Sequence, residues 1–465
     1  MSGTIARSFG DYCAAVTSAT IDDGVVDYSK QLLLDTLGTA VGGFHWSDTT
    51  DMILGTARLL DPSAGHGDVT VLATGEQMTP ANAALANGAL SHSLDYDNRH
   101  SAGSLHIGSA IIPAALAAAQ VQHTTGERLL DGIIAGYDVA ARLGMACNPR
   151  SSHERGFHPT GTCGTFGATA AVGVIMEFTP ADFVNAFGLN GSQAAGSYQC
   201  SIGGGWNKRI HPGLAARNAL VAAAFIDNGF EGPDAPIGGE LGFLQAYADS
   251  PLPERATTGL GEVFEVARTK IKPYPVGTFA HVPIALLIEL AATESLDPAT
   301  IESITVTLPT AGATMFGREP GDSHPTSSVE AQFDMPFAAA LAVTYRDAGL
   351  TSFTDALKRP IDRVFGQLMD RTRTVASDDL QSHLPERYPA RVTVTTETET
   401  YERFRTWVRG EPDHPLTWDE MERKFTDLTP SFSDDSRDEI IAVVRGLESK
   451  SIVDLLEPFQ SVKNQ

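Results

Sequence analysis

The sequence predicts a mainly α-helical protein, built from one large all-helical domain and a smaller α+β domain. Up to about residue 265, Ala and Gly are abundant, apolar residues recur at helical spacing, and strand patterns are scarce. After that point the composition changes, and alternating apolar residues predict strands between helical segments. We therefore assign residues 1–267 to the helical domain, 268–414 to the α+β domain, and 415–465 to C-terminal helices that pack back on the first domain.

Several segments of the first domain have the pattern of buried helices: residues 26–41, 80–94, 107–119, 128–143 and 213–226. In the first of these, Leu33, Leu34 and Leu37 lie on one stripe of the helix. The run 107–119 is shorter than the ~20 residues that cross a bilayer, so it predicts a buried helix and not a membrane span.

The α+β domain shows a mixed pattern. Residues 301–308, where Ile304, Val306 and Leu308 alternate with Ser or Thr, predict a half-buried strand, and residues 390–400 predict another. Helical spacing returns in the intervening and following segments: residues 282–292, 328–347, 361–368 and 418–459. The order of the strands in the sheet stays open at this stage.

The charge of the chain limits its partners. It has 465 residues with 33 Lys and Arg against 57 Asp and Glu, a formal charge of −24 at pH 7. This balance opposes broad binding to nucleic acids or anionic membranes, because both require a basic surface. The four cysteines are too far apart in sequence for a zinc or iron–sulfur motif, and their small number fits a reducing cytoplasm.

Polar residues crowd the segment from 92 to 106, directly after an apolar helix: His92, Asp95, Asp97, Asn98, Arg99, His100 and His106. Neighbouring carboxylates and imidazoles shift one another's pKa, and such pairs are what general acid–base catalysis requires. The alternative is a helix end followed by a solvated loop. The density of the group favours a functional role.

Two further segments place potential cations near a predicted helix start. His158 precedes glycines at 161, 164 and 167, a spacing that favours tight helix packing over a phosphate-binding turn because no strand precedes it. Lys208, Arg209 and His211 stand just before the helix that we expect to begin near residue 213. Cations at a helix start are repelled by the positive end of the macrodipole. An anion such as a substrate carboxylate would therefore stabilise both the cations and the helix end.

The last candidate segment lies at the boundary between the two compositions. It contains Lys270, Lys272, Tyr274 and then His281. Clefts between domains are common ligand sites, so a His at this boundary is a candidate, although the position of His281 taken alone favours a core or capping role over a catalytic one.

Together these segments resemble the MmgE/PrpD family, which includes 2-methylcitrate dehydratases, cis-aconitate decarboxylases and iminodisuccinate epimerases. The resemblance covers nearly the whole chain. It is carried by ordered motifs: Leu34-Asp35-Thr-Leu37-Gly38, Ser91-His92-Ser-Leu94-Asp95-Tyr96-Asp97, His106, Phe157-His158-Pro159, Lys208-Arg209-Ile-His211-Pro-Gly, Gly229-Phe230-Glu231-Gly232-Pro233, and Lys272-Pro-Tyr274-Pro275 with His281.

The resemblance implies a homodimer with an α+β lid and a metal-free, cofactor-free site between the domains. Carried over by position, the implied catalytic residues are Asp95, His106, His158, Lys208 and His281. We predict Arg99, Arg209, His211 and Tyr274 as the substrate-binding residues. The chain departs from the family pattern at three positions, Asn98, Arg99 and Gly277. These departures leave the substrate open.

This set of residues suits a small di- or tricarboxylate, since the cations supply the attraction that the global charge lacks. The sequence therefore predicts a metal-independent lyase that abstracts a proton next to a carboxylate, most like 2-methylcitrate dehydratase. A cis-aconitate-type decarboxylase and an iminodisuccinate-type epimerase are alternatives, because all three reactions pass through carbanion-like states. A catalytically silent dimeric scaffold is an alternative of another class, and a nucleotide-binding oxidoreductase has only the glycine spacing in its favour.

Overall fold

We describe the protein from a computed structural model, in residues 4–63, 65–200, 205–317 and 324–460. The chain divides into two compact units. The helical unit comprises residues 1–93, 97–271 and 417–465, and the mixed unit comprises residues 94–96 and 272–416. The predicted fold class, mainly α with a smaller α+β part, is confirmed.

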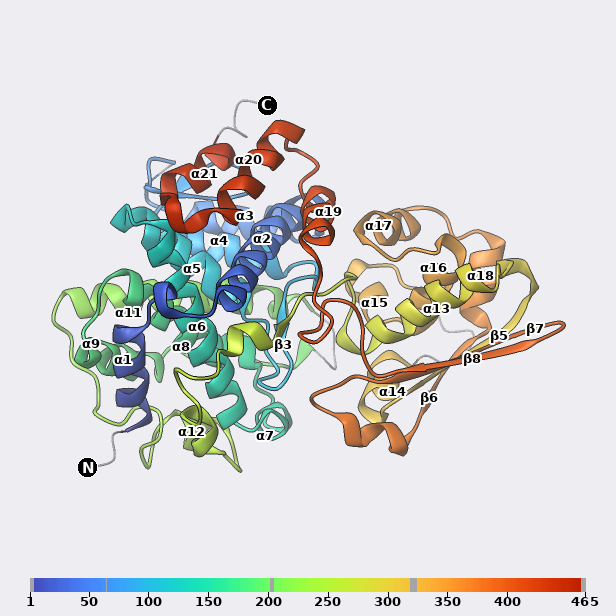
Figure 1. Ribbon diagram of the computed structural model, residues 1–465, viewed down its shortest axis with the longest axis horizontal. Coiled ribbons are helices and arrows are strands. Elements are labelled where there is room, and N and C mark those ends of the chain that lie inside the picture. Colours follow the sequence, from blue (N-terminus) through green and yellow to red (C-terminus); the bar gives the residue numbers. More distant parts are fainter. Residues whose placement is uncertain (1–3, 64, 201–204, 318–323, 461–465) are drawn as a thin grey trace. The chain divides into compact units, whose positions relative to one another are not determined.

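The helical unit contains fourteen α-helices within its described residues (Figure 1). They are α1 (Ile5–Ala15), α2 (Asp23–Trp46), α3 (Thr50–Leu60), α4 (Pro80–His92), α5 (Gly108–Gln122), α6 (Gly126–Ala146), α7 (Pro149–Glu154), α8 (Pro159–Ile175), α9 (Pro180–Asn190), α11 (Asn207–Asp227), α12 (Phe243–Tyr247), α19 (Trp418–Leu428), α20 (Asp434–Arg445) and α21 (Ile452–Gln460). Two short antiparallel pairs join β1 (Val69–Thr70) to β2 (Gln77–Met78) and β3 (Arg99–His100) to β4 (Thr269–Lys270).

The core of the helical unit is formed by α4, α5, α6, α8 and α11, which pack against one another. Every residue of α8 is buried. Its glycines permit a close approach to α6: a Cβ at Gly167 would lie 2.5 Å from the Cβ of Ala140 and 2.6 Å from the carbonyl oxygen of Gly136. The glycines at 161, 164 and 167 thus lie within a packed helix, which agrees with the packing interpretation and not with a phosphate-binding turn.

The C-terminal helix α19 packs on α2 (Figure 1). A capping box starts α19, because Thr417 accepts from the backbone of Glu420 while the Glu420 side chain accepts from the backbone of Thr417. The expected helical stretch 418–459 is divided into three helices, with Pro430 and Gly446 between them. None of the helices in the described residues combines the length and the hydropathy of a membrane span.

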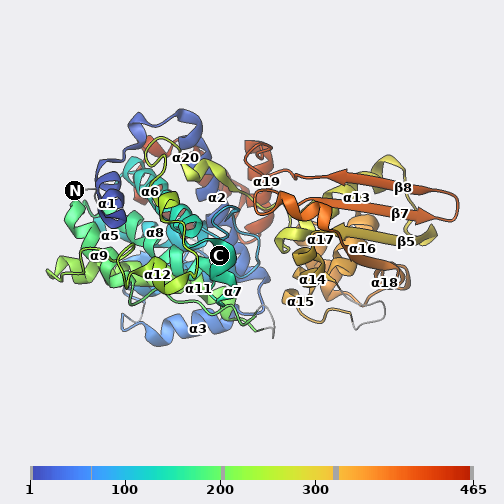
Figure 2. The ribbon, with the colours of Figure 1, turned by 90° about the horizontal axis from the view of Figure 1, so that it is seen from below.

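The mixed unit is built on a four-stranded sheet in the order β6-β5-β7-β8 (Figure 2). Its strands are β5 (Ile301–Leu308), β6 (Thr372–Ala376), β7 (Ala390–Thr396) and β8 (Thr400–Arg405). β5 runs parallel to β6 and antiparallel to β7, with Val306 opposite Val392. The strand expected at 301–308 is confirmed with its alternating burial, whereas the one expected at 390–400 ends at Thr396 and turns into β8.

Six helices accompany this sheet within the described residues: α13 (His281–Thr293), α14 (Thr310–Phe316), α15 (Ser328–Gln332), α16 (Met335–Tyr345), α17 (Leu350–Lys358) and α18 (Arg363–Asp370). The prediction of a single helix over 328–347 is wrong, because the helix is interrupted between Gln332 and Met335. Asp334 caps the new helix by accepting from the backbone N–H of Phe337 at 2.8 Å, and Pro336 suits its first turn.

Candidate functional site

Asp97 lies at the centre of a buried polar group in the helical unit. Its Oδ2 accepts a hydrogen bond from Ser109 Oγ at 2.6 Å and lies 2.9 Å from His92 Nδ1, while its Oδ1 lies 3.1 Å from His106 Nδ1. The side chains of Asp97 and His92 are fully buried. Because an ionised carboxylate can only accept hydrogen bonds, both imidazoles direct an Nδ1–H toward it.

The ionisation of this group follows from its surroundings. Burial alone would raise the pKa of Asp97, but the imidazoles of His92 and His106 lower it well below its usual range. Burial lowers the pKa of His106 to about 3, with Asp97 opposing and Lys208 adding to the decrease. At neutral pH, Asp97 is therefore ionised and His106 is neutral.

The ends of three helices bring these residues together. His92 is the last residue of α4, His106 stands two residues before α5, and His158 is the N-cap residue of α8. The backbone N–H of His106 donates to Thr160 Oγ1 in the first turn of α8 at 2.9 Å. The segment between α4 and α5 is thus fixed by hydrogen bonds to α4 and α5 through Asp97 and to α8 through His106.

His158 and His211 form an adjoining pair. Their Nδ1 atoms are 2.9 Å apart. A hydrogen bond between two ring nitrogens requires one donor and one acceptor, so two neutral rings carry their protons on different nitrogens. The ring of His158 stacks on Tyr198 at 5.1 Å and lies 6.1 Å from the ring of His92. The pair therefore continues the group around Asp97.

Lys208 supplies positive charge to the same region. Helix α11 begins at Asn207, six residues before the expected start, so Lys208 and His211 lie three residues apart on one helical face. Burial, together with the neighbouring His92 and Lys208, lowers the pKa of His211 to about 4. Burial also lowers the pKa of His158 well below its usual range, with Lys208 and His211 contributing. A bound anion would offset this positive charge.

We call six of these residues the histidine cluster: His92, Asp97, His106, His158, Lys208 and His211. Four of them were predicted as site residues from the sequence, and the structure brings these four together within the helical unit. The other two, His92 and Asp97, were absent from the predicted set. Their only signal in the sequence is their place in the polar segment 92–106, because nothing in the residue types distinguishes Asp97 from Asp95.

Asp95 lies in the mixed unit and is ion-paired there. Its Oδ2 lies 3.1 Å from Lys272 Nζ, which also donates to the backbone oxygen of Asp95 at 2.6 Å and to that of Val276 at 3.1 Å. The backbone of Asp95 is in the left-handed region with φ 50°. These contacts hold residues 94–96 in the mixed unit, and a catalytic role for Asp95 stays a prediction.

The other predicted residues of the mixed unit lie side by side. The rings of Tyr274 and His281 stack with centroids 6.1 Å apart, and His281 is buried at the start of α13. Burial raises the pKa of Tyr274 to about 12, so its hydroxyl is protonated at neutral pH. Gly277 has no room for a side chain, because a Cβ there would lie 2.6 Å from Phe316 and 2.7 Å from Phe333. Packing therefore explains this departure from the family pattern.

Arg99 contacts a different set of residues in the helical unit. It donates to Ser104 Oγ at 2.9 Å, and Ser104 Oγ lies 3.0 Å from His153 Nε2. Burial and the charge of Arg99 lower the pKa of His153 to about 4. A substrate-binding role for Arg99 stays a prediction.

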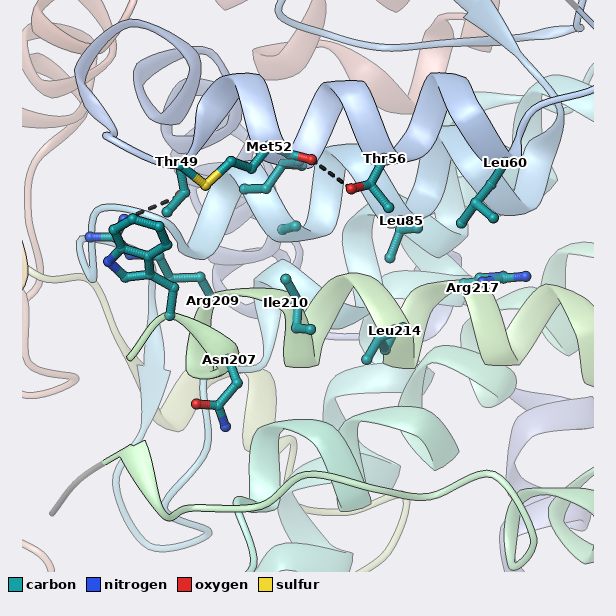
Figure 3. A pocket seen from close by; sticks show the side chains of 13 residues that line it. Thr49, Met52, Thr56, Leu60, Leu85, Asn207, Arg209, Ile210, Leu214 and Arg217 are labelled. Carbon is teal, nitrogen blue, oxygen red and sulfur yellow. Dashed lines mark hydrogen bonds between the residues drawn. The ribbon is translucent and has the colours of Figure 1, made fainter. Parts of the chain in front are cut away.

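Arg209 contacts the loop between α2 and α3. Its guanidinium forms an ion pair with Asp48 and donates to Thr49 Oγ1 at 3.1 Å. Residues two apart on a helix point about 160° away from each other, so Arg209 and His211 face different sides of α11. Figure 3 shows Arg209 at one end of a cavity of about 350 Å³ that is lined mainly by apolar side chains of α3, α4 and α11. None of the histidine cluster lines that cavity.

Two family models match most of this chain. The family model described as "MmgE/PrpD N-terminal domain" matches residues 7–256, and the one described as "MmgE/PrpD C-terminal domain" matches residues 274–449. A cis-aconitate decarboxylase-like protein, oryM, from Aspergillus oryzae is 27% identical over 94% of this chain and 92% of its own length.

Two further relatives carry the name cis-aconitate decarboxylase. The one from Aspergillus terreus is 26% identical over 79% of this chain and 77% of its own length. The human one is 24% identical over 96% of this chain and 92% of its own length. Since the N-terminal family model alone matches more than half of the residues, the chain belongs to the MmgE/PrpD family.

Proposed function

We propose that this protein is a lyase that decarboxylates cis-aconitate or a similar tricarboxylate without a cofactor. The observation that carries the proposal is the histidine cluster, in which one buried carboxylate, four imidazoles and an ammonium group lie together in the helical unit. Such a site attracts a polyanion and offers groups that can transfer a proton.

The names of the relatives favour decarboxylation over the dehydration that the sequence analysis placed first. The three relatives described above are cis-aconitate decarboxylases or decarboxylase-like proteins, and they match three quarters or more of this chain. The 2-methylcitrate dehydratase and epimerase reactions remain alternatives, which the assay below separates.

The proposed reaction breaks one carbon–carbon bond and forms one carbon–hydrogen bond. The bond between the methylene carbon of cis-aconitate and its carboxylate breaks, and its electron pair forms a new double bond to the methylene carbon. The electrons of the old double bond move to the carbon next to another carboxylate, which takes up one proton. The products are carbon dioxide and a 2-methylidene dicarboxylate, so atoms and charge balance.

Lys208 and the imidazoles have distinct roles in this proposal. Lys208 stabilises the negative charge that develops beside the carboxylate, and one of the imidazoles donates the proton. In the ligand-free cluster, the pKa values of His106, His158 and His211 are lowered by burial and partly by Lys208. A bound trianion offsets that positive charge and raises these pKa values, so the substrate itself promotes protonation of its acid.

The test is turnover by the purified chain. We expect cis-aconitate to release carbon dioxide and to give the 2-methylidene dicarboxylate in the NMR spectrum. 2-Methylcitrate and iminodisuccinate serve as the competing substrates, with water loss and optical rotation as their readouts. Turnover of one of these instead replaces the decarboxylase proposal, and no turnover with the whole panel favours the catalytically silent scaffold.

Substitution tests the roles within the cluster. Lys208→Ala and His158→Ala should each lower kcat/KM by about 100- to 1000-fold, because each removes a group that interacts with developing charge or with the transferred proton. The exposed Lys450 offers a matched control, and Lys450→Ala should leave kcat/KM unchanged. Unchanged turnover in Lys208→Ala, with an unchanged unfolding transition, contradicts its catalytic role.

We also propose that the chain forms a homodimer and acts in the cytoplasm, as the family resemblance implies. The mass in solution, measured by light scattering, tests the first point: a value near twice 49.3 kDa supports it and a monomeric value contradicts it. Fractionation of the source cells tests the second.

A further inference from the structure

Three residues of the histidine cluster have the composition of a metal-binding site. His92, Asp97 and His106 each offer a donor atom, and these atoms lie within 4.8 Å of one another. Two imidazoles and a carboxylate are a common three-ligand set for Zn²⁺, with the fourth position left to water. The geometry therefore raises the question of which divalent ion these residues could hold.

We propose that His92, Asp97 and His106 bind one Zn²⁺ ion, and that bound zinc blocks the site for a polycarboxylate substrate. In this state the ion replaces the two hydrogen bonds between the imidazoles and Asp97. The metal has no part in the proposed lyase reaction. Binding itself is independent of the proposed function, and only the inhibition rests on it.

The separations between Asp97 and the two imidazoles require little change, and the donor atoms as a set already lie within 4.8 Å of one another. Bonds of about 2.0–2.1 Å at a tetrahedral ion separate neighbouring ligand atoms by roughly 3.4 Å. The imidazole Nδ1 atoms lie 2.9 and 3.1 Å from the oxygens of Asp97, so these separations need to widen by only a few tenths of an ångström. Each imidazole exchanges its Nδ1 proton for the ion by changing to the other neutral tautomer.

The surrounding contacts favour this donor set. Ser109 Oγ donates to Asp97 Oδ2 at 2.6 Å, and the backbone N–H of His106 donates to Thr160 at 2.9 Å. Such outer contacts orient metal ligands and raise affinity.

One neighbouring charge opposes the ion. Lys208 lies close enough to lower the pKa values of His106, His158 and His211. It therefore repels a divalent cation as well, and its removal should strengthen zinc binding although it weakens catalysis. This opposite response distinguishes the proposed site from nonspecific zinc binding.

The experiment is calorimetric titration of the chelator-treated protein with ZnCl₂. Wild type should bind one ion per chain in this site, and Asp97→Asn and His106→Gln should each weaken the affinity by about 100-fold through loss of a charge or a ligand. Lys208→Met should raise it by about tenfold. The exposed His123 is outside the cluster, so His123→Gln should match wild type. Circular dichroism checks that each variant is folded.

Two results overturn the inference. One is the absence of zinc binding to wild type at millimolar concentration, and the other is unchanged binding in folded Asp97→Asn and His106→Gln. With active protein, ZnCl₂ should inhibit turnover in competition with the substrate, and a chelator should restore it; saturating zinc without inhibition overturns the blocking role. If zinc binds but no polycarboxylate is turned over, the proposed function fails and the metal site stands.

Discussion

Two buried polar groups lie next to each other in the helical unit, and they solve the problem of buried charge differently. In the histidine cluster, the carboxylate of Asp97 contacts two imidazoles, with Lys208 nearby. The second group contains Asp35, Asn98 and Lys424, where Lys424 Nζ lies 2.6 Å from Asp35 Oδ1. We call it the Asp35 network.

The Asp35 network is saturated. Asn98 Nδ2 donates to Asp35 at 3.0 Å and to Thr36 at 3.2 Å, and its Oδ1 accepts from the backbone of Gly108 at 3.1 Å and from Tyr137 at 3.0 Å. The negative charge of Asp35 is paired with the positive charge of Lys424, and both the nitrogen and the oxygen of the Asn98 amide form hydrogen bonds.

The histidine cluster, by contrast, combines a single carboxylate with an excess of groups that can carry positive charge. The imidazoles of His106, His158 and His211 are held neutral at a cost that a bound anion would offset. The difference indicates that buried polarity serves structure where charges and hydrogen bonds balance, and ligand binding where they do not.

The largest expected effect on stability comes from unbalancing the Asp35 network. Lys424→Met leaves Asp35 buried without its counter-ion, and we expect a loss of about 3–5 kcal/mol in the free energy of unfolding. Denaturation in urea measures it. Adding Asp35→Asn to the same chain should recover part of the loss, because no uncompensated charge then remains. Equal stability of Lys424→Met and wild type would show that Lys424 does not compensate the buried charge of Asp35.

A smaller effect is expected from Asn98→Asp. It replaces a donor with a carboxylate oxygen about 3 Å from Asp35, so two hydrogen bonds are lost and two negative charges meet. We expect a loss of roughly 2–3 kcal/mol in the free energy of unfolding. The exposed Asn228 is the matched control, and Asn228→Asp should cost less than about 0.5 kcal/mol. A stabilising Asn98→Asp would contradict the saturation of the network.

The smallest expected effect concerns the histidine cluster and is the pH dependence of stability that His106 causes. The folded pKa of His106, about 3, lies below the value near 6.5 of an unfolded His, so the unfolded chain binds more protons between these values. Stability should therefore fall as the pH decreases from about 7 to 5, by roughly 2 kcal/mol for this imidazole. Asp97 remains ionised over that range, because its lowered pKa affects stability only below about pH 4.

Urea denaturation of wild type and His106→Gln at pH 7 and pH 5 measures this contribution. The variant should lose less stability on acidification than wild type does. Identical losses in the two proteins would show that His106 is not the group held neutral by folding.

The sequence predicts the fold class and much of the site, and its failures have physical causes. Alternation found β5 and a continuous apolar run found α5, because burial on one face or on all faces leaves a pattern in the local sequence. The same spacing runs through Pro336 without a sign of the break, and it placed the start of α11 at residue 213 although the helix begins at Asn207.

The site shows the same limit. Asp95 and Asp97 are two residues apart and alike in type, yet Asp97 lies against His92 and His106 in the helical unit, whereas Asp95 is paired with Lys272 in the mixed unit. Long-range contacts decide this difference, and they leave no local pattern in the chain. The pairing of Asp35 with Lys424 is hidden from sequence reasoning for the same reason.

The position of Lys424 in the chain has a consequence for synthesis. Asp35 is made among the first residues, whereas its counter-ion arrives in α19, after the whole mixed unit has been translated. Until then, α2 must keep this carboxylate hydrated or protonated, so the core of the helical unit cannot close fully on the ribosome. A nascent chain halted before residue 417 should accordingly stay open to proteases at α2, and the synthesis of α19 is the event that completes this core.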